Sequence, residues 1–231
     1  MNHSVEEVVA ILKSKARPDQ LEGMARFGIA VEQRFGWSMP DLRKLGKELG
    51  HDHALALELW RSGIADARIL AGLVAEPARL TEEQTEAWVK DINSWDVCDQ
   101  VCMNLFEKAP FAWRKVREWA GRDEEFVKRT AFSLLACLAW HDKKAKDEQF
   151  IELFPVVKAA AVDERNFVKK AVNWALRNIG KRNARLNAAA IQAARDIQRL
   201  DSKAARWIAS DALRELGGDA VQARLKVRGG A

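Results

Sequence analysis

The stretch Phe126-Val127-Lys128-Arg129 returns about 40 residues later as Phe167-Val168-Lys169-Lys170, and a helix-length apolar pattern follows each copy. A second, looser echo joins residues 175–180 (Ala-Leu-Arg-Asn-Ile-Gly) to residues 212–217 (Ala-Leu-Arg-Glu-Leu-Gly). A recurrence of about 40 to 47 residues is typical of HEAT and armadillo repeats, which bury their apolar faces by stacking on one another. The two echoes therefore predict a stack of diverged helical pairs.

The rest of the chain supports an all-helical fold. Apolar residues recur with helical periodicity, and no run alternates as a strand would. Pro40 and Pro110 stand just ahead of amphipathic runs, as prolines do in first helical turns, and Thr81-Glu82-Glu83-Gln84 has the form of a capping box. We therefore expect an all-α solenoid in which residues 1–231 form a single HEAT-like repeat domain, with a frayed tail from about 224 to 231.

Basic residues are concentrated in one part of the sequence. The chain has 38 Lys and Arg against 33 Asp and Glu, a net charge of +5. Between residues 165 and 195 there is no acidic residue, and such a localised strip favours an anionic partner such as a phosphate backbone. Its basic residues are Arg165, Lys169, Lys170, Arg177, Lys181, Arg182, Arg185 and Arg195.

Several kinds of site are not indicated. The three cysteines, Cys98, Cys102 and Cys137, are an odd number without a CxxC pair, so a reduced chain in the cytoplasm is expected. We expect neither a signal peptide nor a membrane span. His51 and His53 are two residues apart, which does not place them on one helical face, and no third ligand is near. We therefore expect no metal and no cofactor.

A helical wheel separates two faces in each copy of the repeat. In the later copy Val168, Val172, Ala175, Leu176 and Ile179 fall on one side. The opposite side carries Lys170, Trp174, Arg177 and Lys181. In the earlier copy Arg129, Ser133 and Trp140 lie opposite the apolar side. Arg129 aligns with Lys170, so the wheel predicts cations and indoles on one shared binding face.

Trp95 and Asp99 are one helical turn apart in Trp95-Asp96-Val97-Cys98-Asp99. That spacing puts an indole and a carboxylate side by side on one face. The pair has two interpretations: a functional carboxylate next to an aromatic ring, or a core Trp and an Asp that stabilises the start of a helix, with Ser94 or Asn93 as its cap.

These residues resemble the DNA alkylation repair proteins, the AlkD-like bacterial alkylpurine DNA glycosylases built from HEAT-like repeats. The resemblance runs from about Phe27-Gly28-Ile29 to the segment 169–177, and its most specific piece is Ser94-Trp95-Asp96 with Asp99. It implies a right-handed superhelical solenoid with a concave basic cleft. The stretch between Arg129 and Trp174 is several residues longer than in the family, around residues 141–144.

The resemblance also implies roles for individual residues. Asp99, Trp95, Trp174 and Arg129 match the family's catalytic cleft. Asp99 would stabilise an oxocarbenium-like sugar and position water while the cationic purine leaves. The two indoles would contact the sugar and backbone, and the cations would hold phosphates. The DNA-binding set is Lys169, Lys170, Arg177, Lys181 and Arg182.

The sequence thus predicts a monofunctional glycosylase that excises N3- and N7-alkylated purines from double-stranded DNA. It would act as a monomer in the bacterial cytoplasm and nucleoid. Two alternatives remain open: a HEAT-repeat protein that binds damaged or branched DNA without catalysis, and a protein-protein scaffold with an acidic partner.

Overall fold

The computed structural model of the chain describes residues 3–229. It contains two compact units, the N-terminal unit Met1–Ala112 and the C-terminal unit Trp113–Ala231. Within the described residues every regular element is a helix, which confirms the all-α prediction. No helix of the described part is long and apolar enough to cross a membrane. The single-domain interpretation stays a prediction, and each unit is described by itself.

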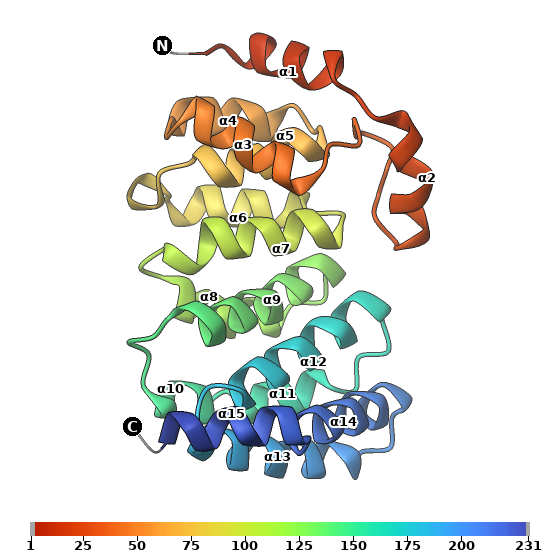
Figure 1. Cartoon of the computed structure of the whole chain (residues 1–231), viewed down its shortest axis with the longest axis vertical. Coiled ribbons are helices and arrows are strands. Elements are labelled where there is room, and N and C mark those ends of the chain that lie inside the picture. Colours follow the sequence, from red (N-terminus) through yellow and green to blue (C-terminus); the bar gives the residue numbers. More distant parts are fainter. Residues whose placement is uncertain (1–2, 230–231) are drawn as a thin grey trace. The chain divides into compact units, whose positions relative to one another are not determined.

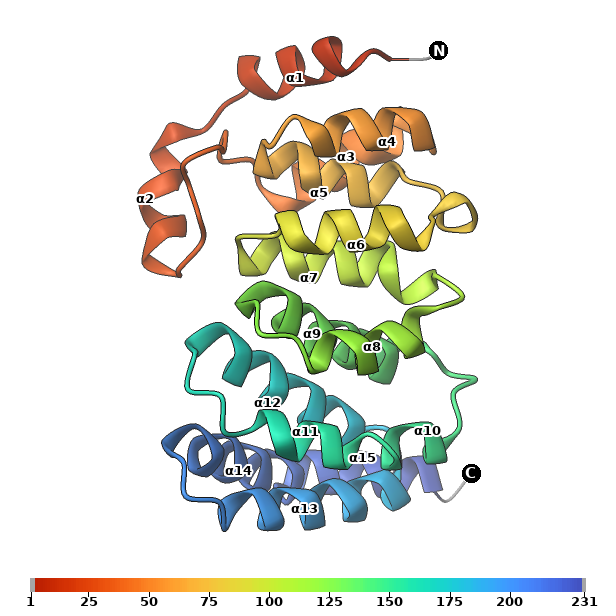
Figure 2. The same ribbon diagram turned by 180° about the vertical axis from the view of Figure 1, so that it is seen from behind.

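The N-terminal unit stacks short helices in pairs (Figures 1 and 2). Helix α5 packs on α3, α4 and α7, so it lies at the centre of the unit. Helix α2 stands to the side of the stack in Figure 2 and has no buried residue. The elements are α1 (Val5–Ser14), α2 (Pro18–Arg26), α3 (Met39–Leu49), α4 (His53–Arg61), α5 (Ala65–Val74), η1 (Pro77–Arg79), α6 (Glu82–Asp91), α7 (Trp95–Asn104) and η2 (Phe106–Lys108).

The C-terminal unit is also built of helices, and its longest have 14 to 17 residues (Figure 1). Helix α12 packs against α9, α11, α13 and α14, so it is the central element of this unit. Its elements are α8 (Ala112–Ala120, which starts at the boundary), α9 (Glu125–His141), α10 (Asp147–Ile151), α11 (Phe154–Ala160), α12 (Asn166–Gly180), α13 (Ala184–Gln198), α14 (Lys203–Leu216) and α15 (Asp219–Gly229).

The sequence echoes correspond to helices that pack on one another. Phe126 and Phe167 lie in the first turns of α9 and α12, and their ring centroids are 5.4 Å apart. The second echo falls on the ends of α12 and α14, where a methyl group added at Gly180 would lie 2.6 Å from Leu216 Cδ1. The echoed segments of successive repeats therefore touch, as a stacked solenoid requires.

Local signals fix where helices begin. Gln84 N–H donates to Thr81 Oγ1 at 3.2 Å and Thr81 N–H donates to Gln84 Oε1 at 3.0 Å, so the predicted capping box is confirmed. Pro40 lies in the first turn of α3 as predicted. The predicted tail is helical in α15 as far as Gly229, and residues 230–231 lie outside the described part.

Candidate functional site

Trp95 and Asp99 lie on one face of α7 in the N-terminal unit, both half-buried. The indole Nε1–H of Trp95 donates to the carbonyl oxygen of Phe27 at 3.0 Å, which fixes the ring. Asp99 is therefore neither sealed in the core nor fully in solvent, and it has an indole one turn away. The prediction of an aromatic ring and a carboxylate on a shared face agrees with this geometry.

The start of α7 is fixed by a buried ion pair that sequence analysis missed. Arg34 Nη1 lies 2.7 Å from Asp96 Oδ2, and the Arg34 side chain is 2% exposed. Ser94, expected as a capping side chain, does not cap α7; its hydroxyl donates to Asp96 Oδ1 at 2.6 Å and accepts from Ala30 N–H at 3.2 Å. A buried pair of this kind costs about 3–5 kcal/mol when one partner is removed. It ties the segment before α3 to the helix that carries Trp95.

A second buried carboxylate holds the same segment. Asp66 is fully buried on α5 and accepts from Phe35 N–H at 2.7 Å and from Trp37 N–H at 3.0 Å. Because buried backbone donors must be paired, this carboxylate satisfies two groups of a loop that has no helix of its own. The carbonyl of Phe27, which accepts from Trp95, belongs to that loop. The indole is therefore hydrogen-bonded to a loop that Asp66 holds in place.

Arg129 is buried in the C-terminal unit. Its residue exposure is 5%, and Nη1–H donates to the carbonyl oxygen of Phe167 at 2.8 Å. The expectation of an exposed outer side on α9 is wrong for Arg129 and Ser133, which are buried, and right for Trp140, which is 53% exposed. A helical wheel treats each helix alone, whereas α12 packs extensively on α9 and the carbonyl of Phe167 in α12 lies against Arg129. Arg129 thus holds the first turn of α12.

The two faces predicted for α12 are confirmed. Val168, Val172, Ala175, Leu176 and Ile179 are fully buried. On the other side Lys170 is exposed, and Trp174, Arg177 and Lys181 are half-buried. The outer face of α12 therefore presents an indole within a row of basic residues.

Acidic residues of α14 lie against this row. Arg177 Nε is 3.5 Å from Asp211 Oδ2, and its Nη1 also pairs with Glu215. Lys181 Nζ is 2.8 Å from the other carboxylate oxygen of Glu215. Burial acts to raise the pKa of Glu215, but the hydrogen bond from Lys181 and the charge of Arg177 outweigh it, so this pKa is lowered.

Several basic residues of the strip from 165 to 195 are therefore paired with carboxylates, so the strip carries less unpaired positive charge than the sequence alone suggests. Arg165 pairs with Asp163, and Arg185 pairs with Glu148 at 2.6 Å. Among residues 3–229 no ion pair joins Lys170 to a carboxylate. Acidic residues just before the strip and on other helices therefore neutralise part of the basic strip inferred from the sequence.

Two predicted DNA-binding residues have structural contacts of their own. Lys169 Nζ lies 5.5 Å from the centre of the Trp207 ring, within range of a cation–π interaction. Arg182 donates to the carbonyl oxygens of Ala139 at 2.7 Å and Asp142 at 2.8 Å, at the C-terminal end of α9. Burial lowers the pKa of Arg182, while the charges of Asp142 and Asp147 act to raise it. An arginine stays charged under such conditions, so it caps α9 as a cation.

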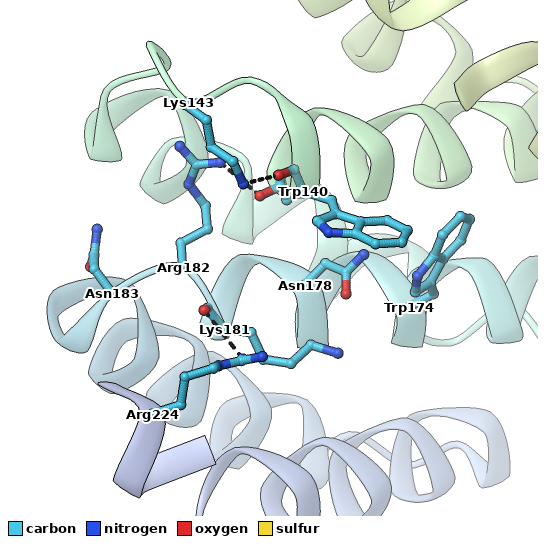
Figure 3. Close-up of a pocket in the computed structure, with 9 residues that line it drawn as sticks. Trp140, Lys143, Trp174, Asn178, Lys181, Arg182, Asn183 and Arg224 are labelled. Atoms are coloured by element: carbon cyan, nitrogen blue, oxygen red, sulfur yellow. Dashed lines mark hydrogen bonds between the residues drawn. The ribbon is translucent and has the colours of Figure 1, made fainter. Parts of the chain in front are cut away.

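A pocket of ≈ 640 Å³ opens beside Trp174 in the C-terminal unit (Figure 3). Three predicted site residues line it, and so does Trp140, which the helical wheel placed on the expected binding face. The other residues of its wall could be found only from the fold. The lining residues are Ala139, Trp140, Lys143, Trp174, Asn178, Lys181, Arg182, Asn183 and Arg224.

The predicted site residues are divided between the units. Trp95 and Asp99 belong to the N-terminal unit, and all the others belong to the C-terminal unit. In the C-terminal unit only Trp174, Lys181 and Arg182 line one pocket, and the meeting of all the predicted residues in one groove stays a prediction. Residues 3–229 contain no cluster of His, Cys, Asp and Glu that could hold a metal ion.

Stacked helical pairs define a class of proteins, the HEAT-like repeat proteins. One solved structure, with a TM-score of 0.78 and 18% identity, covers 96% of both chains. It represents a family described as related to the HEAT-like repeat DNA glycosylases with affinity for branched DNA structures. At this identity the match shows the fold.

The family follows from the sequence match. A family model described as DNA alkylation repair enzyme matches residues 8–216, so the chain belongs to this family. Weaker structural matches include an engineered protein (TM-score 0.45, 16% identity, 94% of this chain and 100% of that one). Another is a designed armadillo repeat protein in complex with a (KR)4 peptide (TM-score 0.37, 16% identity, 80% of this chain and 88% of that one). Curated proteins give no significant match.

Proposed function

We propose that this protein is a monofunctional DNA glycosylase that excises positively charged N3- and N7-alkylated purines from duplex DNA. The observation that carries the proposal is the pair on α7: Asp99 and Trp95 lie one turn apart, both half-buried, on a helix held by the Arg34–Asp96 ion pair. Membership of the DNA alkylation repair enzyme family supports the choice of substrate.

The reaction needs little more than a well-placed carboxylate. The C1′–N bond breaks with its electron pair going to the alkylated purine, which leaves as a neutral base. The sugar becomes an oxocarbenium-like cation, which Asp99 stabilises. Water then adds to C1′ and releases a proton to solvent, leaving an abasic site. Two opposite unit charges about 4 Å apart at an effective dielectric of about 20 interact by about 4 kcal/mol, roughly a thousandfold in rate.

The C-terminal unit would hold the DNA backbone. Lys170 is exposed and Trp174 is half-buried beside it on the outer face of α12, so a phosphate and a sugar can be contacted together. Arg129 and Arg182 would act indirectly, because their guanidinium groups hold carbonyl oxygens of neighbouring helices. We also propose that the protein works as a monomer in the bacterial cytoplasm, where its DNA substrate lies.

The first test is base release from a duplex that contains N7-methylguanine, measured as abasic sites above the rate without protein. Asp99→Asn removes the charge and keeps the shape, so we expect a loss on the order of 100- to 1,000-fold in the single-turnover rate. Glu83→Gln, an exposed position on α6, is the charge-matched control and should keep the full rate. Full activity in the Asp99→Asn variant would remove Asp99 from the mechanism.

A second candidate is DNA binding without catalysis. The solved structure with a TM-score of 0.78 represents a family described as having affinity for branched DNA structures. The second candidate assigns the same affinity to this protein. Wild-type protein that binds a four-way junction more tightly than a linear duplex, and releases no base from any alkylated duplex, would favour it over the glycosylase.

A further inference from the structure

The pocket beside Trp174 has two different sides. In Figure 3 the indoles of Trp140 and Trp174 lie at one side, and Arg182, Asn183 and Arg224 lie at the other. The pocket is formed wholly within the C-terminal unit, between the end of α9, the end of α12 and α15. Its volume of ≈ 640 Å³ is within the range of pockets that hold small organic ligands.

The pocket is built by fixed groups. Asn178, which lines the pocket, donates from Nδ2–H to the carbonyl oxygen of Ala136 at 3.1 Å and so joins α12 to α9. Asp142 Oδ1 accepts from the backbone N–H of Lys144 at 3.1 Å and of Ala145 at 3.0 Å, which shapes the turn after α9. The guanidinium of Arg182 closes the same turn on its carbonyl oxygens. The wall is therefore formed before any ligand arrives.

Two indoles supply flat apolar surface at the opening. Trp140 is 53% exposed, unusual for a side chain that usually contributes to cores, and its ring stacks on His141 at 4.8 Å. Trp174 is half-buried on the facing helix. Exposed aromatic rings of this kind provide platforms on which bases stack, and that interaction is independent of base identity.

The remaining wall selects for negative charge. Lys143, Lys181, Arg182 and Arg224 line the pocket, and no carboxylate is among its lining residues. Lys181 is paired with Glu215 and Arg182 with carbonyl oxygens, whereas Lys143 and Arg224 are exposed and hold backbone carbonyls. These two cations can turn to an incoming phosphate at little cost, because they give up only an exposed contact.

We propose that this pocket binds an unpaired nucleotide of single-stranded DNA, with the base against Trp140 and Trp174 and the phosphate at Lys143 and Arg224. The proposal rests on the proposed function only for the choice of DNA as the source of the nucleotide. An acidic peptide would satisfy the cations but would leave the two indole faces without a matching planar group, so the nucleotide fits better.

The test compares two labelled probes of identical duplex sequence, one blunt and one with a six-nucleotide unpaired 5′ flap. The wild type should bind the flapped probe more tightly. Trp140→Ala should weaken flap binding about tenfold and leave blunt binding unchanged, the size expected when one stacking platform is removed. Lys143→Ala should weaken flap binding by a smaller factor. Trp207→Ala on α14 and Lys158→Ala on α11 remove an exposed indole and an exposed lysine elsewhere in this unit, and should keep the preference.

Three outcomes would overturn the proposal. The wild type could bind both probes equally, or Trp140→Ala could lower the affinity for both probes by the same factor. The third is an oligoglutamate peptide that displaces the flapped probe in a way that depends on Trp140 and Lys143. Base release from blunt alkylated duplex, measured in parallel, separates this proposal from the glycosylase. Flap preference that depends on Trp140 without base release supports the pocket alone. Base release without flap preference supports the glycosylase alone.

Discussion

Arg129 and Arg182 show how a cation in a basic strip can serve the fold. Each guanidinium is buried or half-buried and donates to backbone carbonyl oxygens of another helix, Arg129 to α12 and Arg182 to the end of α9. Arg182 satisfies carbonyls at the end of α9, which have no partner within their own helix. Arginine suits this role because its planar donors spread over several acceptors and its charge persists on burial. A count of basic residues therefore overstates how many can reach a ligand.

Asp163 provides a pH-dependent example at the same scale. Its carboxylate accepts from Arg165 Nε–H at 2.9 Å, and its Oδ2 lies 3.4 Å from Lys128 Nζ on α9. The hydrogen bonds from Arg165 lower the pKa of Asp163. A lowered carboxylate pKa contributes stability that is present above the unfolded value of about 3.8 and is lost as pH falls through the folded value.

Asp163→Asn should therefore reduce the free energy of unfolding by about 1 kcal/mol at pH 7, and the deficit should shrink as pH falls below about 4. Urea unfolding at pH 7 and pH 3 measures both. Asp201→Asn is the control, since that side chain is fully exposed and its pairing with Arg206 at 3.4 Å should contribute little. A deficit of equal size at both pH values would mean that the ion pair is not its cause.

At the scale of elements, the repeat was readable because local rules and packing agree. The Phe-Val-Lys echo predicted equivalent first turns, and Phe126 and Phe167 do pack on each other. The buried face of α12 followed from periodicity alone. By contrast, the burial of Arg129 depends on how closely α12 stacks on α9, which a single-helix pattern does not contain.

The acidic partners of α12 escaped sequence analysis for a related reason. Asp211 and Glu215 lie about one repeat after Arg177, and only the stacking of α14 on α12 brings them within reach. The pocket beside Trp174 likewise joins the ends of α9 and α12 to Arg224 of α15. Residue types at a site were predictable, whereas their pairing across repeats was not.

Gly180 lies where α12, α13 and α14 pack closely, so a substitution there measures how tight this packing is. A Cβ atom there would lie 2.6 Å from Leu216 Cδ1 and 3.0 Å from Ala190 Cβ. Gly180→Ala should destabilise the C-terminal unit by about 1–3 kcal/mol, because overpacking outweighs the gain of about 1 kcal/mol in helix propensity. Gly23→Ala on α2 meets nothing within 4 Å and should be neutral or stabilising. Denaturant unfolding checks both, and a stabilised Gly180→Ala variant would show that Leu216 moves aside easily.

For the whole molecule, the excess of positive charge is small, and its availability depends on pairing. The chain carries a net charge of +5, yet Arg177 and Lys181 share the carboxylate of Glu215. Binding to duplex DNA releases condensed counterions in proportion to the number of phosphates neutralised, so the salt dependence of affinity counts the cations that reach the backbone. Because Glu215 holds Arg177 and Lys181, it reduces the number of cations near the end of α12 that can neutralise phosphates.

Glu215→Gln should free Lys181 and leave Arg177 with Asp211 as its remaining carboxylate partner, so both cations become more available to phosphates. We expect duplex affinity at 0.1 M salt to rise, and the slope of log K against log salt to steepen by up to about 0.9 for each additional phosphate contact. Glu83→Gln, an exposed residue of the N-terminal unit, makes the same change in net charge without freeing a cation of α12, so its slope should match the wild type. If Glu215→Gln and Glu83→Gln give the same slope, Arg177 and Lys181 do not contact the backbone, and the DNA-binding face would have to be sought at Lys170 and Trp174 alone.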